Sequence, residues 1–576
     1  MNKVLIIMSL LVLFNSKAKS NVRLVQNIKA VTNAIGIIKY FHPTKNATAI
    51  NWDKFTQFAV FKVKNLESDN QLCDTLNFIF RDIAADVRFS PIIDTSDTEK
   101  KTIYKADESI YFWKHKGYGY GKKEYSLFMK LFFSNWNSKV LSCKVKDCKF
   151  KYLLQPHSFQ LNDSISCNLV LASNSQIFNN KIKSSINFNL DFSTQFIQYS
   201  SFINAWNILK HFYPNATESG FDFDNFLEFM VLKIDQGLSN EKFELYMRNY
   251  LLNLNDKHIG FGNREKRNVY FYKYKHFRLP FELKLIENKV IVSQINDSIT
   301  PFHIGDVILS VNNQNLDSLL KNEISFHNEK NRAIRQKNYI EKMLFAYNNE
   351  QVEFIVKKKN STIKLNIRIK LIEDHRPHIQ EFEENYFYIN FSYVTEKELK
   401  QYYEKLKNAS GIIADSRERT AGAMNFFIKQ ITCKPIYKGT WFEPLFYFPY
   451  QKYSIRNKVN QILLKPDKNL IKVPIVFLAG PNCYSAGESN LETIKYYKLG
   501  VIIGEPTAGC NGDVNLAYLN EKYVLSFTQL KVLNRDGSDF SNIGILPDIY
   551  FPDNFVTISN DNDPIINFAL QHLKNK

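Results

Sequence analysis

Two hydrophobic patterns alternate from about residue 386 to the end of the chain. Runs of consecutive apolar residues at 411–414, 473–479 and 501–503 are typical of buried strands. Residues 423–431 and 486–499 instead carry apolar side chains at helical spacing. Strands that alternate with helices in this way predict an α/β domain.

Two earlier stretches show the short alternating runs of β structure. One spans about 277–370 and contains Val290-Ile-Val-Ser, Gly305-Asp-Val-Ile-Leu-Ser-Val-Asn and Val352-Glu-Phe-Ile-Val. The other lies within about 105–195 and includes Ser166-Cys-Asn-Leu-Val-Leu. We therefore expect a β domain in the first stretch and a smaller β-rich insert in the second.

A repeat connects two helical parts of the chain. Residues 34–43 match residues 205–214 at a constant offset of 171, and each copy ends in a proline. The correspondence continues to Asp53 and Asp224, each followed by apolar residues at helical spacing. Because proline ends a helix, each copy predicts one helix, a loop and a second helix that begins near the aspartate.

The first twenty residues have the pattern of a secretory signal peptide. Lys3 precedes an apolar run from Val4 to Phe14, and the small residues Ala18 and Ser20 follow at the spacing of a cleavage site. The run is too short to cross a membrane, and no later segment reaches 18 uninterrupted apolar residues. We expect an exported protein, periplasmic or extracellular, cleaved near Ser20 and without a transmembrane segment.

Composition narrows the class of protein. The 576 residues are 44% hydrophobic and 23% charged, which is globular and excludes collagen-like and low-complexity chains. The net charge of +18 is scattered rather than clustered, so it favours solubility over nucleic-acid binding. Seven cysteines are too few for a disulfide scaffold in so long a chain. Cys143 and Cys148 can staple a hairpin, but the sequence leaves their pairing open, and neither a metal site nor a cofactor is predicted.

Candidate chemistry concentrates around Ser485. The strand at 473–479 leads through a Gly-Pro-Asn turn to Ser485-Ala-Gly-Glu488 and a helix, so Ser485 stands at a helix N-terminus. Free backbone N–H groups there favour negative charge, which suits a nucleophile with the Ala486 N–H as oxyanion donor. The alternative is structural: Ser485 is a helix cap and Glu488 completes a capping box.

Four motifs together resemble a known family. Ser485-Ala-Gly-Glu, Gly504-Glu-Pro-Thr-Ala-Gly, the earlier Gly305-Asp-Val-Ile-Leu-Ser-Val-Asn and Asp415-Ser-Arg are similar to the serine peptidases that include the C-terminal processing (tail-specific) proteases and the tricorn protease core. The resemblance covers about residues 196–576. It implies a multidomain α/β fold with a catalytic domain like those of ClpP and crotonase.

The resemblance implies that the β domain is PDZ-like. Such a domain binds an extended chain by adding it to a sheet edge. The glycine-rich loop that captures a free carboxyl terminus in this family is replaced here by Arg278-Leu-Pro-Phe-Glu-Leu. Capture of a free C-terminus is therefore not part of the expectation.

The resemblance also implies a Ser/His rather than a Ser/Lys site. Tail-specific enzymes carry a lysine 25 positions after the serine, and this position holds Cys510. Tricorn-like members use a histidine just before the PDZ domain, where His258 stands. His258 is thus the expected general base.

The remaining catalytic positions depart from the family pattern. The glutamate expected to orient the histidine aligns with Ser541, so the candidates are Ser541 itself and the nearby Asp539 and Asp536, with Asp539 favoured. The second oxyanion donor is expected from the backbone of Ala421 or Gly422, where the family has two glycines. Cys483, near the helix start, is an alternative nucleophile, although a packing role is favoured.

These observations define the expected organisation. We predict an exported serine endopeptidase that cleaves extended or unfolded polypeptides, with a peptide as its partner and no nucleic acid. The alternative is a catalytically silent peptide-binding or scaffold protein of the same fold. The expected parts are a signal peptide (1–20), a first helical unit (21–104), the β insert (105–195), a second helical unit carrying His258 (196–270), the PDZ-like domain (271–372) and the α/β peptidase domain (373–576).

Overall fold

A computed structural model provides the structure of the chain. It describes residues 2–44, 47, 50–92, 105–118, 139–175, 188, 192–254, 256–264, 277–286, 289–297, 300–316, 340, 344, 349–373, 378–418, 420, 422–452, 454–458, 461–468, 470–541, 543–552 and 563–575, with the backbone alone for 2–19.

The two copies of the repeat form two interlocked sets of helices. The first set is α1 (Asn2–Phe41), α3 (Trp52–Val63) and α4 (Asp69–Phe80), and the second is α6 (Thr194–Phe212), α7 (Phe223–Asp235) and α8 (Asn240–Leu251). Each short helix packs on the long helix of the other copy, α3 on α6 and α7 on α1. The predicted helical repeat is therefore present, and its copies share one core.

Gly36 and Asn207 mark the crossing of the two long helices, at equivalent positions of the repeat. A Cβ atom on Gly36 would lie 1.9 Å from Asn207 Oδ1, so only glycine fits there. The Asn207 side chain donates hydrogen bonds to Thr32 O at 2.9 Å and Ile203 O at 3.1 Å. One copy thus supplies the space and the other the polar side chain that fills it.

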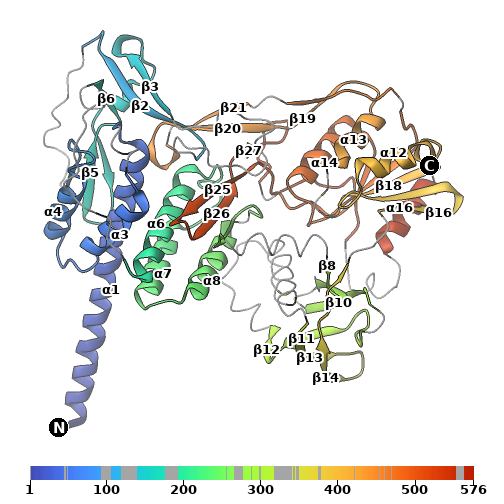
Figure 1. Cartoon of the computed structure of the whole chain (residues 1–576), viewed down its shortest axis with the longest axis horizontal. Helices are drawn as coiled ribbons and strands as arrows, with labels where there is room; N and C mark the ends of the chain where they lie inside the picture. The colour runs from blue at the N-terminus through green and yellow to red at the C-terminus, as the bar shows by residue number, and fades with distance from the viewer. Residues whose placement is uncertain are drawn as a thin grey trace.

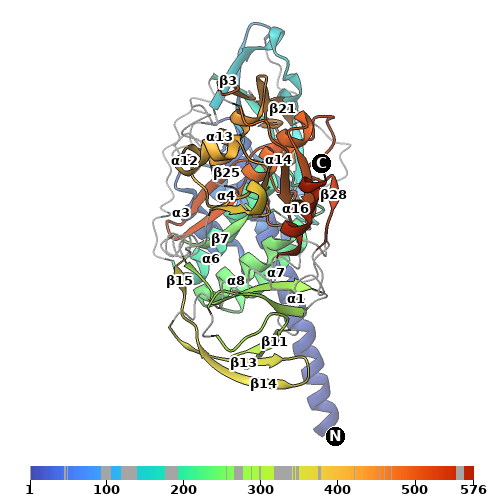
Figure 2. The same cartoon turned by 90° about the vertical axis from the view of Figure 1, so that its right-hand side faces the viewer.

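Helix α1 runs without interruption through the segment predicted to be a signal peptide, and its N-terminal part projects from the body in both views (Figures 1 and 2). Among the described residues, no helix combines the length and the apolar character needed to span a membrane.

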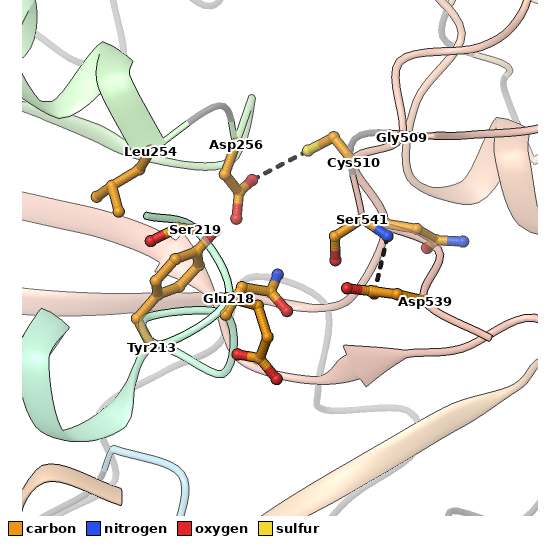
Figure 3. Close-up of a pocket in the computed structure, with 11 residues that line it drawn as sticks. Tyr213, Glu218, Ser219, Leu254, Asp256, Gly509, Cys510, Asp539 and Ser541 are labelled. Atoms are coloured by element: carbon orange, nitrogen blue, oxygen red, sulfur yellow. Dashed lines mark hydrogen bonds between the residues drawn. The ribbon is translucent and has the colours of Figure 1, made fainter. Parts of the chain in front are cut away.

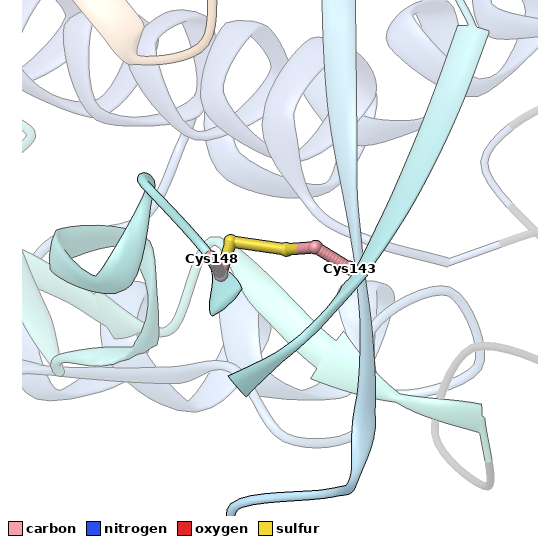
Figure 4. Close-up of a disulfide and its surroundings, with 2 residues drawn as sticks. All are labelled: Cys143 and Cys148. Carbon is pink, nitrogen blue, oxygen red and sulfur yellow. A yellow bond between two sulfur atoms is a disulfide. The ribbon is translucent and has the colours of Figure 1, made fainter. Parts of the chain in front are cut away.

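The strands of the β-rich region belong to two different sheets. One sheet has the order β1-β5-β4, and the other has the order β21-β20-β2-β3 with β6 and β27 at its sides. The strands are β1 (Arg88–Pro91), β2 (Ser109–Lys116), β3 (Lys139–Lys144), β4 (His157–Gln160), β5 (Ile165–Leu169) and β6 (Ala172–Asn174), with short helices η1 (Val145–Asp147) and η2 (Lys151–Leu154). A disulfide joins Cys143 on β3 to Cys148, with Cα atoms 5.5 Å apart (Figure 4).

A separate six-stranded sheet lies at the lower end of the molecule in Figures 1 and 2. Its order is β14-β13-β11-β10-β9, with β12 paired to β11. The strands are β9 (Phe281–Ile286), β10 (Lys289–Ile295), β11 (Val307–Val311), β12 (Gln314–Asn315), β13 (Gln351–Lys357) and β14 (Thr362–Arg368), and β8 (Phe277–Arg278) pairs with β15 (Ile372–Glu373) beside them. Its own apolar core makes it a distinct domain.

The C-terminal domain is a three-layer sandwich. Its sheet has the order β16-β17-β18-β23-β24-β28, parallel except for β16, and comprises β16 (Ile379–Phe382), β17 (Tyr386–Asn390), β18 (Gly411–Asp415), β23 (Ile475–Ala479), β24 (Val501–Gly504) and β28 (Ile549–Tyr550). One face is covered by α12 (Glu396–Lys407), α13 (Ala423–Ile431) and α14 (Ala486–Tyr497), and the other by α16 (Pro564–Lys574). A short helix, η4 (Glu383–Asn385), joins β16 to β17. The predicted multidomain α/β fold is confirmed.

Excursions from this domain reach back to the N-terminal parts. They comprise β20 (Trp441–Phe446), η5 (Pro449–Gln451), β21 (Ile455–Lys458), β25 (Val514–Leu519), β26 (Tyr523–Thr528) and β27 (Lys531–Val532), whereas β19 (Ile436–Lys438) and β22 (Ile462–Leu464) pair with each other beside α13 and α14. Strand β26 pairs with β7 (Gly260–Asn263), which follows η3 (Leu252–Leu254). This pairing brings the loop that carries His258 against the peptidase domain.

Candidate active site

Ser485 stands where the central parallel strand gives way to a helix. Strand β23 ends at Ala479, and Ser485 is the last residue before α14. Its backbone has φ 58° and ψ −120°, a conformation that L-residues rarely adopt. Strain of this kind is often held at functional sites by the surrounding structure.

Glu488 holds the strained turn in place. Its Oε1 accepts hydrogen bonds from Thr507 Oγ1 and Gly509 N, both at 2.6 Å, and its Oε2 accepts from Cys510 N at 3.0 Å and Ser485 N at 3.2 Å. Complete burial raises the pKa of Glu488 to about 7, although these four hydrogen bonds favour the ionised form. The carboxylate therefore joins the serine turn to the loop at 507–510.

His258 is fixed by groups from two distant parts of the chain. Its backbone N–H donates to Asp256 Oδ1 at 2.8 Å, and its Nδ1 lies 2.9 Å from Thr528 Oγ1 and 3.5 Å from Asp256 Oδ1. Burial opposes ionisation of Asp256, but the hydrogen bond and charge interaction with His258 outweigh it and lower the Asp256 pKa to about 2. Asp256 and Thr528 are thus placed to orient the imidazole.

Cys510 connects the serine to the histidine. Its carbonyl oxygen accepts the Ser485 N–H at 2.8 Å. Its Sγ lies 3.0 Å from Asp256 Oδ1, 3.5 Å from His258 Nδ1 and 3.1 Å from the Lys257 N–H. Burial first, and then Asp256, raise the pKa of this thiol well above its usual value, so Cys510 is an unreactive thiol. Ser485 and His258 lie on either side of it, without a hydrogen bond between the Ser485 Oγ and the His258 ring.

Lys257 forms a second link between the two loops. Its Nζ donates to Pro481 O at 2.7 Å, in the turn before Ser485, and lies 5.4 Å from the centre of the Tyr484 ring. The Tyr484 and His258 ring centres are 6.0 Å apart. Three consecutive residues, 256–258, therefore all contact the serine side of the site.

The expected oxyanion donors are the Ala486 N–H, at the start of α14, and the backbone at 421–422. The Ala486 N–H donates to no other described residue, so it is available to a substrate oxygen. Thr420 contacts this turn: its Oγ1 accepts from Asn490 at 3.2 Å and would lie 3.5 Å from a Cβ on Gly487. Gly422, two residues on, has φ −63°, a backbone conformation open to any residue. Ala421 lies outside the described residues.

Asp539 and Ser541 make their hydrogen bonds away from the histidine. Asp539 accepts the Ser541 N–H at 3.1 Å and pairs with Lys531 at 3.2 Å. Both line a cavity of about 70 Å³ that Asp256 and Cys510 also line (Figure 3). The contacts of the His258 ring thus go to Thr528, Asp256 and Cys510, and the role given to Asp539 stays a prediction.

Sequence reasoning missed Asp256 and Thr528. Asp256 had a local signal in the sequence, because an aspartate side chain commonly accepts a hydrogen bond from the backbone N–H two positions later, which here is that of His258. Thr528 had none, because it lies 270 positions from His258 and only the pairing of β26 with β7 brings it near. Cys483, the alternative nucleophile, is fully buried, and burial raises its thiol pKa well above the usual value.

Comparisons with known proteins agree with this architecture. Residues 378–551 match the family model described as Peptidase family S41, and residues 274–387 match the model described as PDZ domain. No curated protein matches the chain.

Solved structures resemble the chain at low identity. The crystal structure of a CPAF mutant is 11% identical with a TM-score of 0.50, over 66% of this chain and 98% of that chain. The photosystem II D1 C-terminal processing protease is 15% identical with a TM-score of 0.40, over 65% of this chain and 99% of that chain. The tricorn protease is 14% identical with a TM-score of 0.36, over 81% of this chain and 45% of that chain. The first of these likenesses supports the fold alone. The two family matches show that the chain carries a PDZ domain and a peptidase family S41 domain, and is a serine-type peptidase.

Proposed function

We propose that the chain is an exported endopeptidase that hydrolyses peptide bonds of extended or unfolded polypeptides through an acyl-enzyme on Ser485, with His258 as general base. The observation that carries the proposal is the double contact of Cys510. Its carbonyl holds the Ser485 N–H, and its Sγ lies against Asp256 and His258. Residues more than 220 positions apart in the sequence are thereby held in one site.

The hydrogen bonds of the imidazole support the role of a base. A proton on Nδ1 is donated to Thr528 Oγ1, 2.9 Å away, with Asp256 close by to stabilise the imidazolium. The Nε2 lone pair is then free to accept the Ser485 proton. In unliganded enzymes the bond between nucleophile and base is often long and closes when substrate binds.

The reaction then follows from the positions of these groups. The Ser485 oxygen attacks the substrate carbonyl carbon as His258 takes its proton. The Ala486 N–H, with a backbone donor of the 421–422 turn, stabilises the negative oxygen. The C–N bond breaks as His258 returns the proton to the leaving amine, and a water repeats the sequence to release the acid. The positive end of α14 favours the same charge.

The PDZ domain supports an extended polypeptide as substrate. Domains of this type bind a chain as an added strand, using backbone hydrogen bonds that do not depend on side chains. The first helical segment has the signal-peptide pattern, which supports export.

A digestion experiment tests the proposal. The purified protein is incubated with an unstructured polypeptide and the fragments are identified by mass spectrometry, beside Ser485→Ala and the control Ser489→Ala on the same helix. We expect fragments from the wild type and Ser489→Ala but none from Ser485→Ala. Binding of the polypeptide without cleavage by any of the three would contradict the proposal and favour a silent peptide-binding protein.

A further inference from the structure

Asp256, His258 and Cys510 bring three metal-binding atoms together in a buried cluster. Cys510 Sγ lies 3.0 Å from Asp256 Oδ1 and 3.5 Å from His258 Nδ1, and the oxygen and nitrogen are 3.5 Å apart. All three residues are buried. We propose that this cluster is a binding site for Zn²⁺ or a similar transition-metal ion, and that occupation of the site inhibits the peptidase.

The spacing of the three atoms is close to that of a tetrahedral zinc site. Zinc bonds of about 2.0 Å to oxygen and nitrogen and about 2.3 Å to sulfur place neighbouring ligand atoms roughly 3.3–3.6 Å apart. Both distances to His258 Nδ1 are 3.5 Å, and the sulfur-to-oxygen distance of 3.0 Å widens with a small rotation of the thiol. An ion bound here takes the place of the hydrogen bond between His258 Nδ1 and Thr528 Oγ1. The Cys510 thiol loses its proton to solvent and binds the ion as a thiolate.

The donor set selects the metal. A thiolate and an imidazole favour zinc, cobalt and copper, whereas magnesium and calcium prefer oxygen ligands alone. One carboxylate and one thiolate neutralise a divalent ion, so the occupied cluster carries no net charge in its buried surroundings.

Groups around the cluster support metal binding. The Lys257 N–H already points at Cys510 Sγ from 3.1 Å, a contact that stabilises a thiolate. Asp256 Oδ2 is buried without a hydrogen-bond partner and remains available to a further ligand. The cavity of about 70 Å³ beside Asp256 and Cys510 is large enough for a water as the fourth ligand of the ion (Figure 3).

Inhibition follows from which nitrogen the metal takes. An ion on Nδ1 leaves the neutral ring with its proton on Nε2, the nitrogen that must accept the Ser485 proton. The His258 Nε2 then donates a hydrogen bond and can no longer accept the proton of Ser485. This consequence rests on the proposed function, whereas the metal site itself does not.

Cobalt provides a probe that needs no activity. Metal-free protein is titrated with Co²⁺, and the absorption of a thiolate–cobalt charge transfer and of tetrahedral cobalt is recorded, then repeated with excess Zn²⁺. We expect bands that Zn²⁺ removes, that Cys510→Ala abolishes, and that two control variants, Cys433→Ala at an exposed thiol and Cys483→Ala at a buried one, retain. Loss of one ligand should weaken binding at least about tenfold.

Two further measurements keep the test decisive. X-ray absorption of the zinc-loaded wild type should show one sulfur among nitrogen and oxygen neighbours, which settles the site if Cys510→Ala fails to fold. Zinc should inhibit peptide cleavage by the wild type in proportion to occupancy. Cobalt bands that survive in Cys510→Ala, or a first shell without sulfur, would overturn the site. A metal bound with these signatures but without loss of cleavage would overturn the inhibition alone.

Discussion

The Cys510 carbonyl oxygen and the Ser485 N–H form a 2.8 Å hydrogen bond, and the same cysteine contacts His258 through its sulfur. Position 510 is where the tail-specific pattern expects a lysine. Cys510, which occupies that position here, contacts both Ser485 and His258, the proposed nucleophile and the proposed base.

Asp256 and Asp539 can be told apart by matched substitutions. Asp256→Asn should lower kcat by about 10²- to 10⁴-fold, because its carboxylate faces the His258 Nδ1. Asp539→Asn should change kcat less than about fivefold, since its partner is Lys531 in a half-exposed ion pair. Steady-state kinetics on one peptide compare them. A larger loss in Asp539→Asn would return the orienting role to the residue expected from sequence.

Thr528 should act on the histidine and not on the substrate. Thr528→Val keeps the shape of this buried side chain but removes the hydroxyl 2.9 Å from His258 Nδ1. We expect kcat to fall about tenfold with KM unchanged, because the imidazole loses the partner that fixes its tautomer. Thr528→Ser should restore most of the rate. An equal loss in the serine variant would mean that the methyl group, through packing, is what matters.

Glu488 should make stability depend on pH. Its pKa in the folded protein, raised by burial to about 7 from 4.5, means that the folded state holds this proton more tightly than the unfolded state. Protonation of Glu488 therefore contributes about 3 kcal/mol to the free energy of unfolding. This contribution is fully present below about pH 4.5 and is lost as the pH rises from 4.5 to about 7. Denaturant unfolding across this range measures it.

Glu488→Gln is the control for that pH dependence. The variant removes the titration, so the difference in unfolding free energy between it and the wild type should change with pH over the same interval. It also turns an amide N–H₂ toward two N–H or O–H donors, at a cost of about 1–3 kcal/mol. A difference that stays constant with pH would assign the titration elsewhere.

Gly36→Ala tests the crossing of the two long helices. The added Cβ would meet Asn207 Oδ1 at 1.9 Å and His211 Nε2 at 2.8 Å, so these buried side chains, or the helix that carries them, must shift. We expect a loss of about 1–3 kcal/mol in unfolding free energy. The double variant Gly36→Ala/Asn207→Ala should recover part of that loss, measured by the same thermal or denaturant unfolding. Full stability of the single variant would show that the crossing is less tight than described.

Sequence patterns anticipated the parts of the site that are local. Ser485 was expected at the junction of strand and helix because an apolar run, a turn and a helical stretch follow one another in the chain. The capping role predicted for Glu488 is present, since its carboxylate accepts the Ser485 N–H, and the same carboxylate also holds the loop that leads to Cys510. The helical repeat was likewise visible as sequence identity at a fixed offset.

The contacts that complete the site depend on long-range pairing. Thr528 reaches His258 because β26 pairs with β7, and no periodicity in either strand specifies that partner. The interlocking of the repeat copies was hidden for the same reason, since apolar spacing shows which face of a helix is buried but not which helix covers it. The disulfide depended on β3 and η1 placing two nearby cysteines at bonding distance.

The pairing of β2 with β20 decides how the chain can be cut. His115 and Lys116 lie opposite Phe446 and Leu445, so one sheet is built partly from the insert and partly from the peptidase domain. A fragment limited to the two family matches would leave β20 with an open edge on the β2 side, and exposed edges recruit other chains. Expression trials that seek a minimal protease should therefore retain residues 105–175, which keep the β2 side of β20 covered.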